Sequence, residues 1–166
     1  MIKATVRSLN ATHVIATWDW VLIQLWRGEV TLGDAEKLLA LGREFIATGR
    51  GGHPLNILTI IESRSPAPTQ KVRSILSACF AEFAKTTQNQ FFVSEGSGFR
   101  AALIRGVGLT VSTLAPTLLP FKFATSLDEV AVTIGPHISA AAGGADGLKQ
   151  AVADLRYLLD KQSVPS

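Results

Sequence analysis

A nearly continuous apolar segment lies near the middle of this chain, at residues 55–61. Such a run is typical of a central strand that is covered on both faces of a sheet. The polar residues 62–65 follow directly, and a helical pattern begins after Pro68. The sequence therefore predicts a buried strand whose carboxyl end opens into a polar loop, where open α/β sheets usually place ligand or regulatory sites.

A β-hairpin is predicted near the amino terminus. Residues 13–18 and 21–27 are rich in β-branched and aromatic types, and the short polar break Asp19-Trp20 separates them. Two such runs around a short turn favour antiparallel strands. Short strands are also predicted at 91–94 and 121–124.

Helices are predicted after these strands from apolar spacings of three and four residues. The first begins at the N-cap Thr31, with Asp34 completing a capping box, and ends at residues 49–52. Further helices are expected over 72–83, from Ser97 or Gly98 to Leu114, from Ser126 to Gly135, and over 146–161. The last amphipathic segment is either a helix packed on the sheet or an arm that docks on a partner.

Length and composition favour one domain over residues 1–166, with a core at about 13–135 and a helical extension at 136–162. Apolar residues make up 47% and charged residues 17%, which indicates a filled interior. The net charge of +3 is spread as single basic residues, so nucleic acid is not expected as a partner. No signal peptide and no membrane-spanning stretch are recognised, which predicts a cytoplasmic protein without a transmembrane segment.

The residue pattern contains no recognisable catalytic or metal-binding constellation. His13, His53 and His137 lie far apart and are interpreted as surface or loop residues, and no metal-ligand spacing is present. Ser97 lacks the flanking glycines of a nucleophile elbow. The lone Cys79, set among apolar neighbours, is interpreted as a small buried hydrophobe rather than a reactive thiol. We therefore expect a protein that is not an enzyme and binds no cofactor.

The element order, together with the stretches Trp26-Arg27-Gly28-Glu29-Val30-Thr31 and Ser97-Gly98-Phe99-Arg100-Ala101-Ala102-Leu103, resembles the STAS-like group. This group includes relatives of the anti-sigma-factor antagonists and of the sulfate-transporter cytoplasmic domain. The resemblance covers roughly residues 13–135. It implies an α/β fold with a mixed β-sheet of about five strands, an N-terminal β-hairpin and four to five α-helices.

The resemblance also implies a regulatory serine after the third strand. In the anti-sigma-factor antagonists this loop carries an Asp-Ser-Ser/Thr-Gly motif whose serine is phosphorylated. Here an acid is followed by a serine, no glycine follows, and Pro66 and Pro68 stand in the loop. Ser63 matches the phosphoacceptor best and Ser65 is the second choice, while both are also ordinary turn or capping residues.

Two functions follow from these observations. The first is a regulatory or signalling module that acts through protein-protein contact or self-association, with Trp18, Trp20 and Arg100 as a possible interaction surface. The second is a binder of a small apolar or amphipathic ligand such as a lipid. It is suggested by the almost uncharged stretch 104–121 beside Phe123.

Overall fold

A computed structural model describes residues 2–49, 53–95 and 121–162 of the chain. It contains one mixed sheet in which the six strands lie side by side in chain order. The first two pairings, β1–β2 and β2–β3, are antiparallel, and the remaining three are parallel. The strands are β1 (Thr5–Leu9), β2 (His13–Trp18), β3 (Val21–Trp26), β4 (Asn56–Ile61), β5 (Asn89–Ser94) and β6 (Phe121–Ala124).

The sheet has one strand more than the five that the sequence predicts. The additional strand is β1, which pairs with β2 at the sheet edge and carries a register shift between Val6 and Ser8. Its side chains are mostly exposed, so the segment shows no apolar alternation. The predicted hairpin is confirmed as β2 and β3, and the predicted buried strand is confirmed as β4, all of whose residues are buried.

Both helices on one side of the sheet have a threonine N-cap, and the first begins where its predicted capping box places it. For α1 (Leu32–Thr48), the Asp34 amide donates to Thr31 Oγ1 at 3.2 Å and the Thr31 amide donates to Asp34 Oδ2 at 2.9 Å. An N-cap of this kind contributes about 1 kcal/mol to helix stability. The predicted end near Gly49 is also confirmed. The next helix, α2 (Gln70–Ala84), is capped by Thr69.

The carboxyl-terminal third of the chain forms two further helices. Ser126 caps α4 (Leu127–Ile134), and two short 3₁₀ turns then lead to α5 (Gly144–Gln162). The apolar side of α5 lies in the same core cluster as β2 and β3, which decides between the two interpretations of this segment. It is a helix packed on the sheet. The predicted third helix, from Ser97 or Gly98 to Leu114, lies outside the described residues.

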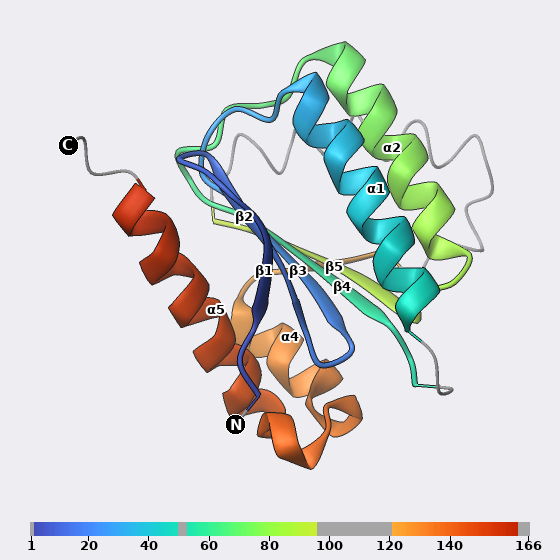
Figure 1. Cartoon of the computed structure of the whole chain (residues 1–166), viewed down its shortest axis with the longest axis vertical. Helices are drawn as coiled ribbons and strands as arrows, with labels where there is room; N and C mark the ends of the chain where they lie inside the picture. The colour runs from blue at the N-terminus through green and yellow to red at the C-terminus, as the bar shows by residue number, and fades with distance from the viewer. Residues whose placement is uncertain (1, 50–52, 96–120, 163–166) are drawn as a thin grey trace.

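The elements form three layers, with α1 and α2 on one face of the sheet and α4 and α5 on the other (Figure 1). Each face has its own cluster of buried apolar side chains. The α/β class that the sequence predicts is therefore confirmed. Within the described residues, no helix combines the length and the apolar character needed to cross a membrane.

Candidate functional site

Charged side chains gather where the parallel strands β3, β4 and β5 end. Because these strands run in the same direction, their carboxyl ends meet at one edge of the sheet. Arg27 follows β3, Glu62 follows β4 and Glu95 follows β5. The helix α5, which packs on the face of the sheet opposite α1 and α2, contributes Arg156 and Asp160. We call this group of five residues the carboxyl-edge network.

Glu62 is the centre of the carboxyl-edge network. Arg27 donates to it twice, from Nε at 2.6 Å and from Nη2 at 3.1 Å, and Arg156 Nη1 donates to it at 2.9 Å. Only 8% of Glu62 is exposed, and a buried carboxylate is tolerated in a protein when it is paired and hydrogen-bonded. The hydrogen bond to Glu62 also raises the pKa of Arg27.

The network joins the sheet to α5. Arg27 Nη1 lies 2.8 Å from Asp160 Oδ1, and Arg156 makes an ion pair with Glu95. These contacts bring together residues that are far apart in the chain, such as Arg27 with Asp160 and Glu62 with Arg156. The carboxyl end of α5 is therefore held at the same edge as the loop that follows β4.

The carboxyl-edge network borders a cleft of about 430 Å³. Ser63 and Arg64, from the loop after β4, complete its lining. Both are exposed, and Arg64 forms no ion pair within the described part of the chain. The cleft thus presents an accessible hydroxyl and an available guanidinium beside paired charges, a surface suited to a polar partner.

The two predicted phosphoacceptors differ in accessibility. Ser63 is exposed at the rim of the cleft. Ser65 is only 6% exposed, and its Oγ donates a hydrogen bond of 3.0 Å to the Gly28 carbonyl. Ser65 therefore fixes the loop against the bend after β3, and Ser63 is the serine that another protein can reach.

Of the residues predicted to form an interaction surface, the structure describes Trp18 and Trp20, which differ in exposure. Trp18 is 1% exposed and belongs to the core under α4 and α5, with Nε1 donating to the Ile2 carbonyl at 2.9 Å. It is buried because its side chain points to the sheet face that α5 covers. Trp20 is partly exposed and stacks on His53, with the ring centroids 4.2 Å apart. Arg100 lies outside the described residues.

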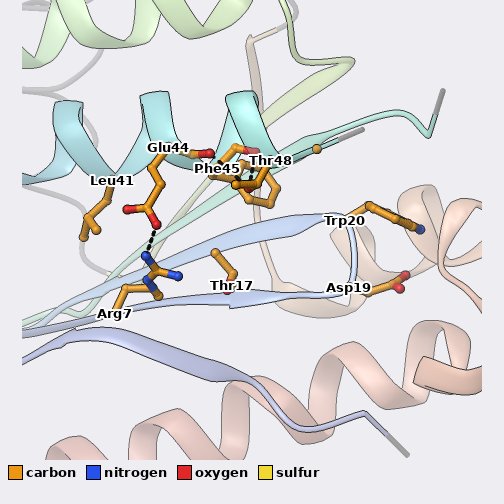
Figure 2. Close-up of a pocket in the computed structure, with 9 residues that line it drawn as sticks. Arg7, Thr17, Asp19, Trp20, Leu41, Glu44, Phe45 and Thr48 are labelled. Carbon is orange, nitrogen blue, oxygen red and sulfur yellow. Dashed lines mark hydrogen bonds and ion pairs between the residues drawn. The ribbon is translucent and has the colours of Figure 1, made fainter. Parts of the chain in front are cut away.

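Trp20 borders a second, smaller hollow of about 190 Å³ between α1 and the first two strands (Figure 2). An ion pair between Arg7 of β1 and Glu44 of α1 lies across it. Asp19, also in its lining, accepts hydrogen bonds from the Ser139 amide and hydroxyl at 2.8 and 2.9 Å. The charged groups of this hollow, Arg7, Asp19 and Glu44, are already paired within the protein, in contrast to Arg64.

His13 is buried, which corrects the prediction that it is a surface or loop residue. It lies in β2 at 1% exposure, with Nε2 2.9 Å from Ser8 Oγ, because β1 and α1 cover this part of the strand. Burial lowers its pKa, although Asp34 nearby acts in the opposite direction. His53 and His137 are exposed, as predicted.

The described residues offer few other groups for metal binding, thiol chemistry or lipid binding. No three His, Cys, Asp or Glu side chains within residues 2–49, 53–95 and 121–162 are grouped so that they could hold a metal ion. Cys79 is buried, as predicted, and burial raises the pKa of its thiol to about 12. Of the predicted lipid-binding stretch, 104–120 lies outside the described residues, while Phe123 on β6 is 37% exposed.

Sequence reasoning located the edge of the sheet but missed most of the network. Arg27 and Glu95 could have been found, because Arg27 is the last residue of one predicted strand and Glu95 directly follows another. Arg156 and Asp160 carried no such signal, since charged residues on an amphipathic helix usually face water.

Comparison with models of known protein families and with curated proteins finds no match for this chain.

Proposed function

We propose that this chain is a non-enzymatic, STAS-like regulatory module of the cytoplasm that binds a protein partner or a second copy of itself at the cleft beside the carboxyl-edge network. The observation that carries the proposal is the position of Ser63. Its exposed hydroxyl lies at the carboxyl end of the central strand β4, at the rim of a charged cleft. This is the position that the STAS-like resemblance assigns to a regulatory serine.

The charges of the cleft support a protein partner. Three guanidinium groups and three carboxylates line it, so its charges are mixed rather than of one sign. A surface of this kind favours a partner with complementary charges, and such complementarity contributes mainly to specificity and association rate. Arg64, without an ion pair in the described residues, is the basic group most available to that partner.

A phosphate on Ser63 would change the cleft directly. It would add a charge of about −1.5 to −2 next to Glu62 and Glu95 and close to Arg64. The new group would compete with the two carboxylates for the arginines and repel an acidic partner surface. We expect phosphorylation to weaken the docking of a partner at this edge.

The test compares Ser63→Glu with Ser74→Glu. Ser74 is exposed on α2 and is not part of the cleft lining, so its substitution adds the same charge elsewhere. Proteins recovered with each variant from the native cell are quantified by mass spectrometry, and self-association is measured by light scattering. We expect Ser63→Glu to lower recovery of one partner, or the dimer fraction, at least tenfold, with no change for Ser74→Glu.

The proposal fails if both variants and the unmodified protein recover the same partners in the same amounts. It also fails if the protein is strictly monomeric and recovers no partner. An Arg64→Ala variant provides an independent check, because it removes a charge from the cleft without adding a negative one. Weaker partner recovery with Arg64→Ala is expected.

A further inference from the structure

Within the described residues, four buried side-chain atoms have no hydrogen-bond partner, and two of them, Gln24 Nε2 and Thr59 Oγ1, border the same space in the core under α1 and α2. Gln24 of β3 and Thr59 of β4 are neighbours across the parallel pairing, and they are 0% and 3% exposed. Neither Gln24 Nε2 nor Thr59 Oγ1 has a hydrogen-bond partner in the part of the chain that the structure describes. Buried polar groups are nearly always paired, so two unpaired ones on adjacent strands require an explanation.

The identity of the unpaired atoms is fixed by Trp26. Trp26 Nε1 can only donate, and it lies 3.4 Å from Gln24 Oε1. The Gln24 side chain must therefore present its oxygen to Trp26 and its amide nitrogen elsewhere. Both unpaired groups, the amide N–H and the Thr59 hydroxyl, can donate a hydrogen bond, so they need an acceptor.

Gln24 and Thr59 line the same small internal cavity of about 20 Å³. The rest of its lining is apolar and includes Leu38 of α1, Leu76 of α2 and Phe92 of β5. A space of this size holds one water-sized group. A charged group is excluded, because no ionisable side chain lines the cavity and a lone buried charge is strongly unfavourable.

We propose that this cavity is a binding site for one neutral hydrogen-bond acceptor, an oxygen atom that accepts from both Gln24 Nε2 and Thr59 Oγ1. The site does not depend on the function proposed for the carboxyl-edge cleft. The oxygen belongs either to a water molecule or to the polar end of a small amphipathic molecule. Both sources share the same chemistry at the two donors.

For the second source, the same row of the sheet places apolar side chains beside the cavity. Thr59 pairs in register with Phe92, and Phe92 pairs with Phe123 of β6. The rings of Phe92 and Phe123 lie 5.6 Å apart, and Phe123 is 37% exposed. Because the cavity holds only one water-sized group, an amphipathic molecule with its oxygen at Gln24 and Thr59 would have to displace neighbouring side chains such as Phe92.

Whether the Thr59→Val substitution lowers or raises the free energy of unfolding tests the site. Thr59→Val keeps the shape of the side chain and removes its hydroxyl. With an acceptor bound, the variant loses a hydrogen bond, and we expect its unfolding equilibrium constant to rise about fivefold. In an empty cavity, the variant removes an unpaired donor and becomes more stable. Thr5→Val, at an exposed strand position, is the control for the change of residue type.

A second measurement identifies the acceptor and keeps the test independent of packing. A high-resolution crystal structure is expected to show density within hydrogen-bond distance of both Gln24 Nε2 and Thr59 Oγ1. Native mass spectrometry of protein purified gently from cells separates the sources, since an added organic mass indicates an amphipathic molecule and an unmodified mass indicates water. A cavity without density, together with a stabilised Thr59→Val variant, overturns the proposal.

Discussion

The two faces of the sheet use the same strands but bury different chemistry. Under α4 and α5, one row across the central strands β2 to β5 consists of Ala16, Ile23, Leu58 and Phe91, all apolar. The next row, one residue further along, faces α1 and α2 and consists of Ile15, Gln24, Thr59 and Phe92. A shift of one residue thus separates a fully apolar row from one with two polar side chains at its centre.

This difference separates packing from recognition. An apolar row gains stability from burial alone and makes no directional demand on a neighbour. A buried amide and hydroxyl are costly until an acceptor meets them, so they select for the chemistry of whatever lies beside them. At these two rows, the face under α4 and α5 is therefore a packing surface, and the face under α1 and α2 can also recognise a ligand.

Truncating one leucine on each face is expected to give the largest effect. Leu155 of α5 and Leu38 of α1 are both buried, at 1% and 0% exposure. Leu155→Ala should lower the free energy of unfolding by about 2–5 kcal/mol, as for other core leucines. Leu38→Ala should cost less, because Leu38 lines the existing cavity and the space left by its side chain adjoins the proposed oxygen, so a further water can fill that space and hydrogen-bond to it. Urea denaturation measures both, and equal losses would contradict the contrast between the faces.

A pair of glycines sharpens the same comparison. A Cβ at Gly147 of α5 would lie 1.8 Å from the Ala142 carbonyl oxygen, and one at Gly42 of α1 would lie 1.9 Å from Phe83 Cζ. We expect both alanine variants to lose about 1–3 kcal/mol through overpacking. Gly147→Ala should lose more, since a backbone carbonyl moves less readily than the end of a ring. Thermal unfolding of the two variants checks the order, and the reverse order would show that the α1–α2 contact is the tighter one.

His13, which is buried on the α1–α2 face, should make the stability of the protein depend on pH. Burial lowers the pKa of folded His13 below its ordinary value of 6.5, so the unfolded chain takes up a proton first. The contribution of His13 to the free energy of unfolding is complete above pH 6.5. It should be lost as the pH drops through 6.5 towards the folded-state pKa. Denaturation at several pH values measures this loss. A His13→Gln variant should show a smaller loss, and His53→Gln, at an exposed position, should behave as the unmodified protein does.

The smallest expected effect concerns the reactivity of Cys79 in the core under α1 and α2. Its thiol has a pKa raised from 9.0 to about 12 by burial, so almost no thiolate exists in the folded protein at pH 8. Iodoacetamide should therefore modify Cys79 slowly in buffer and rapidly in urea above the unfolding transition, as followed by mass spectrometry. Equally fast modification in buffer would show that this face opens locally.

The same pKa shift predicts a loss of stability in strong alkali. Because the folded-state pKa of Cys79 lies above its unfolded value of 9.0, its contribution is complete below pH 9 and is lost as the pH rises towards 12. A Cys79→Ala variant should lose less stability than the unmodified protein over this range. Parallel curves for the two proteins would indicate that other groups dominate alkaline unfolding.

Local patterns were sufficient to predict the hairpin, the central strand and several helix ends. Thr31 and Asp34 lie three residues apart, and their mutual hydrogen bonds need only that spacing, so the start of α1 could be read directly from the chain. The continuous apolar run of β4 likewise requires cover on both faces wherever the strand lies. By contrast, β1 was missed because an exposed edge strand needs no apolar alternation.

The chain by itself indicated five of the six strands and the helices of the described residues, because capping and periodicity act between near neighbours. It also led to the prediction of a regulatory loop at the carboxyl end of β4. Only the tertiary structure brought Arg156 to Glu62 across 94 positions, buried Ser65 while leaving Ser63 exposed, and aligned Gln24 with Thr59 around one cavity. These outcomes depend on strand register and helix packing, which join residues whose separation in sequence carries no information about their distance in space.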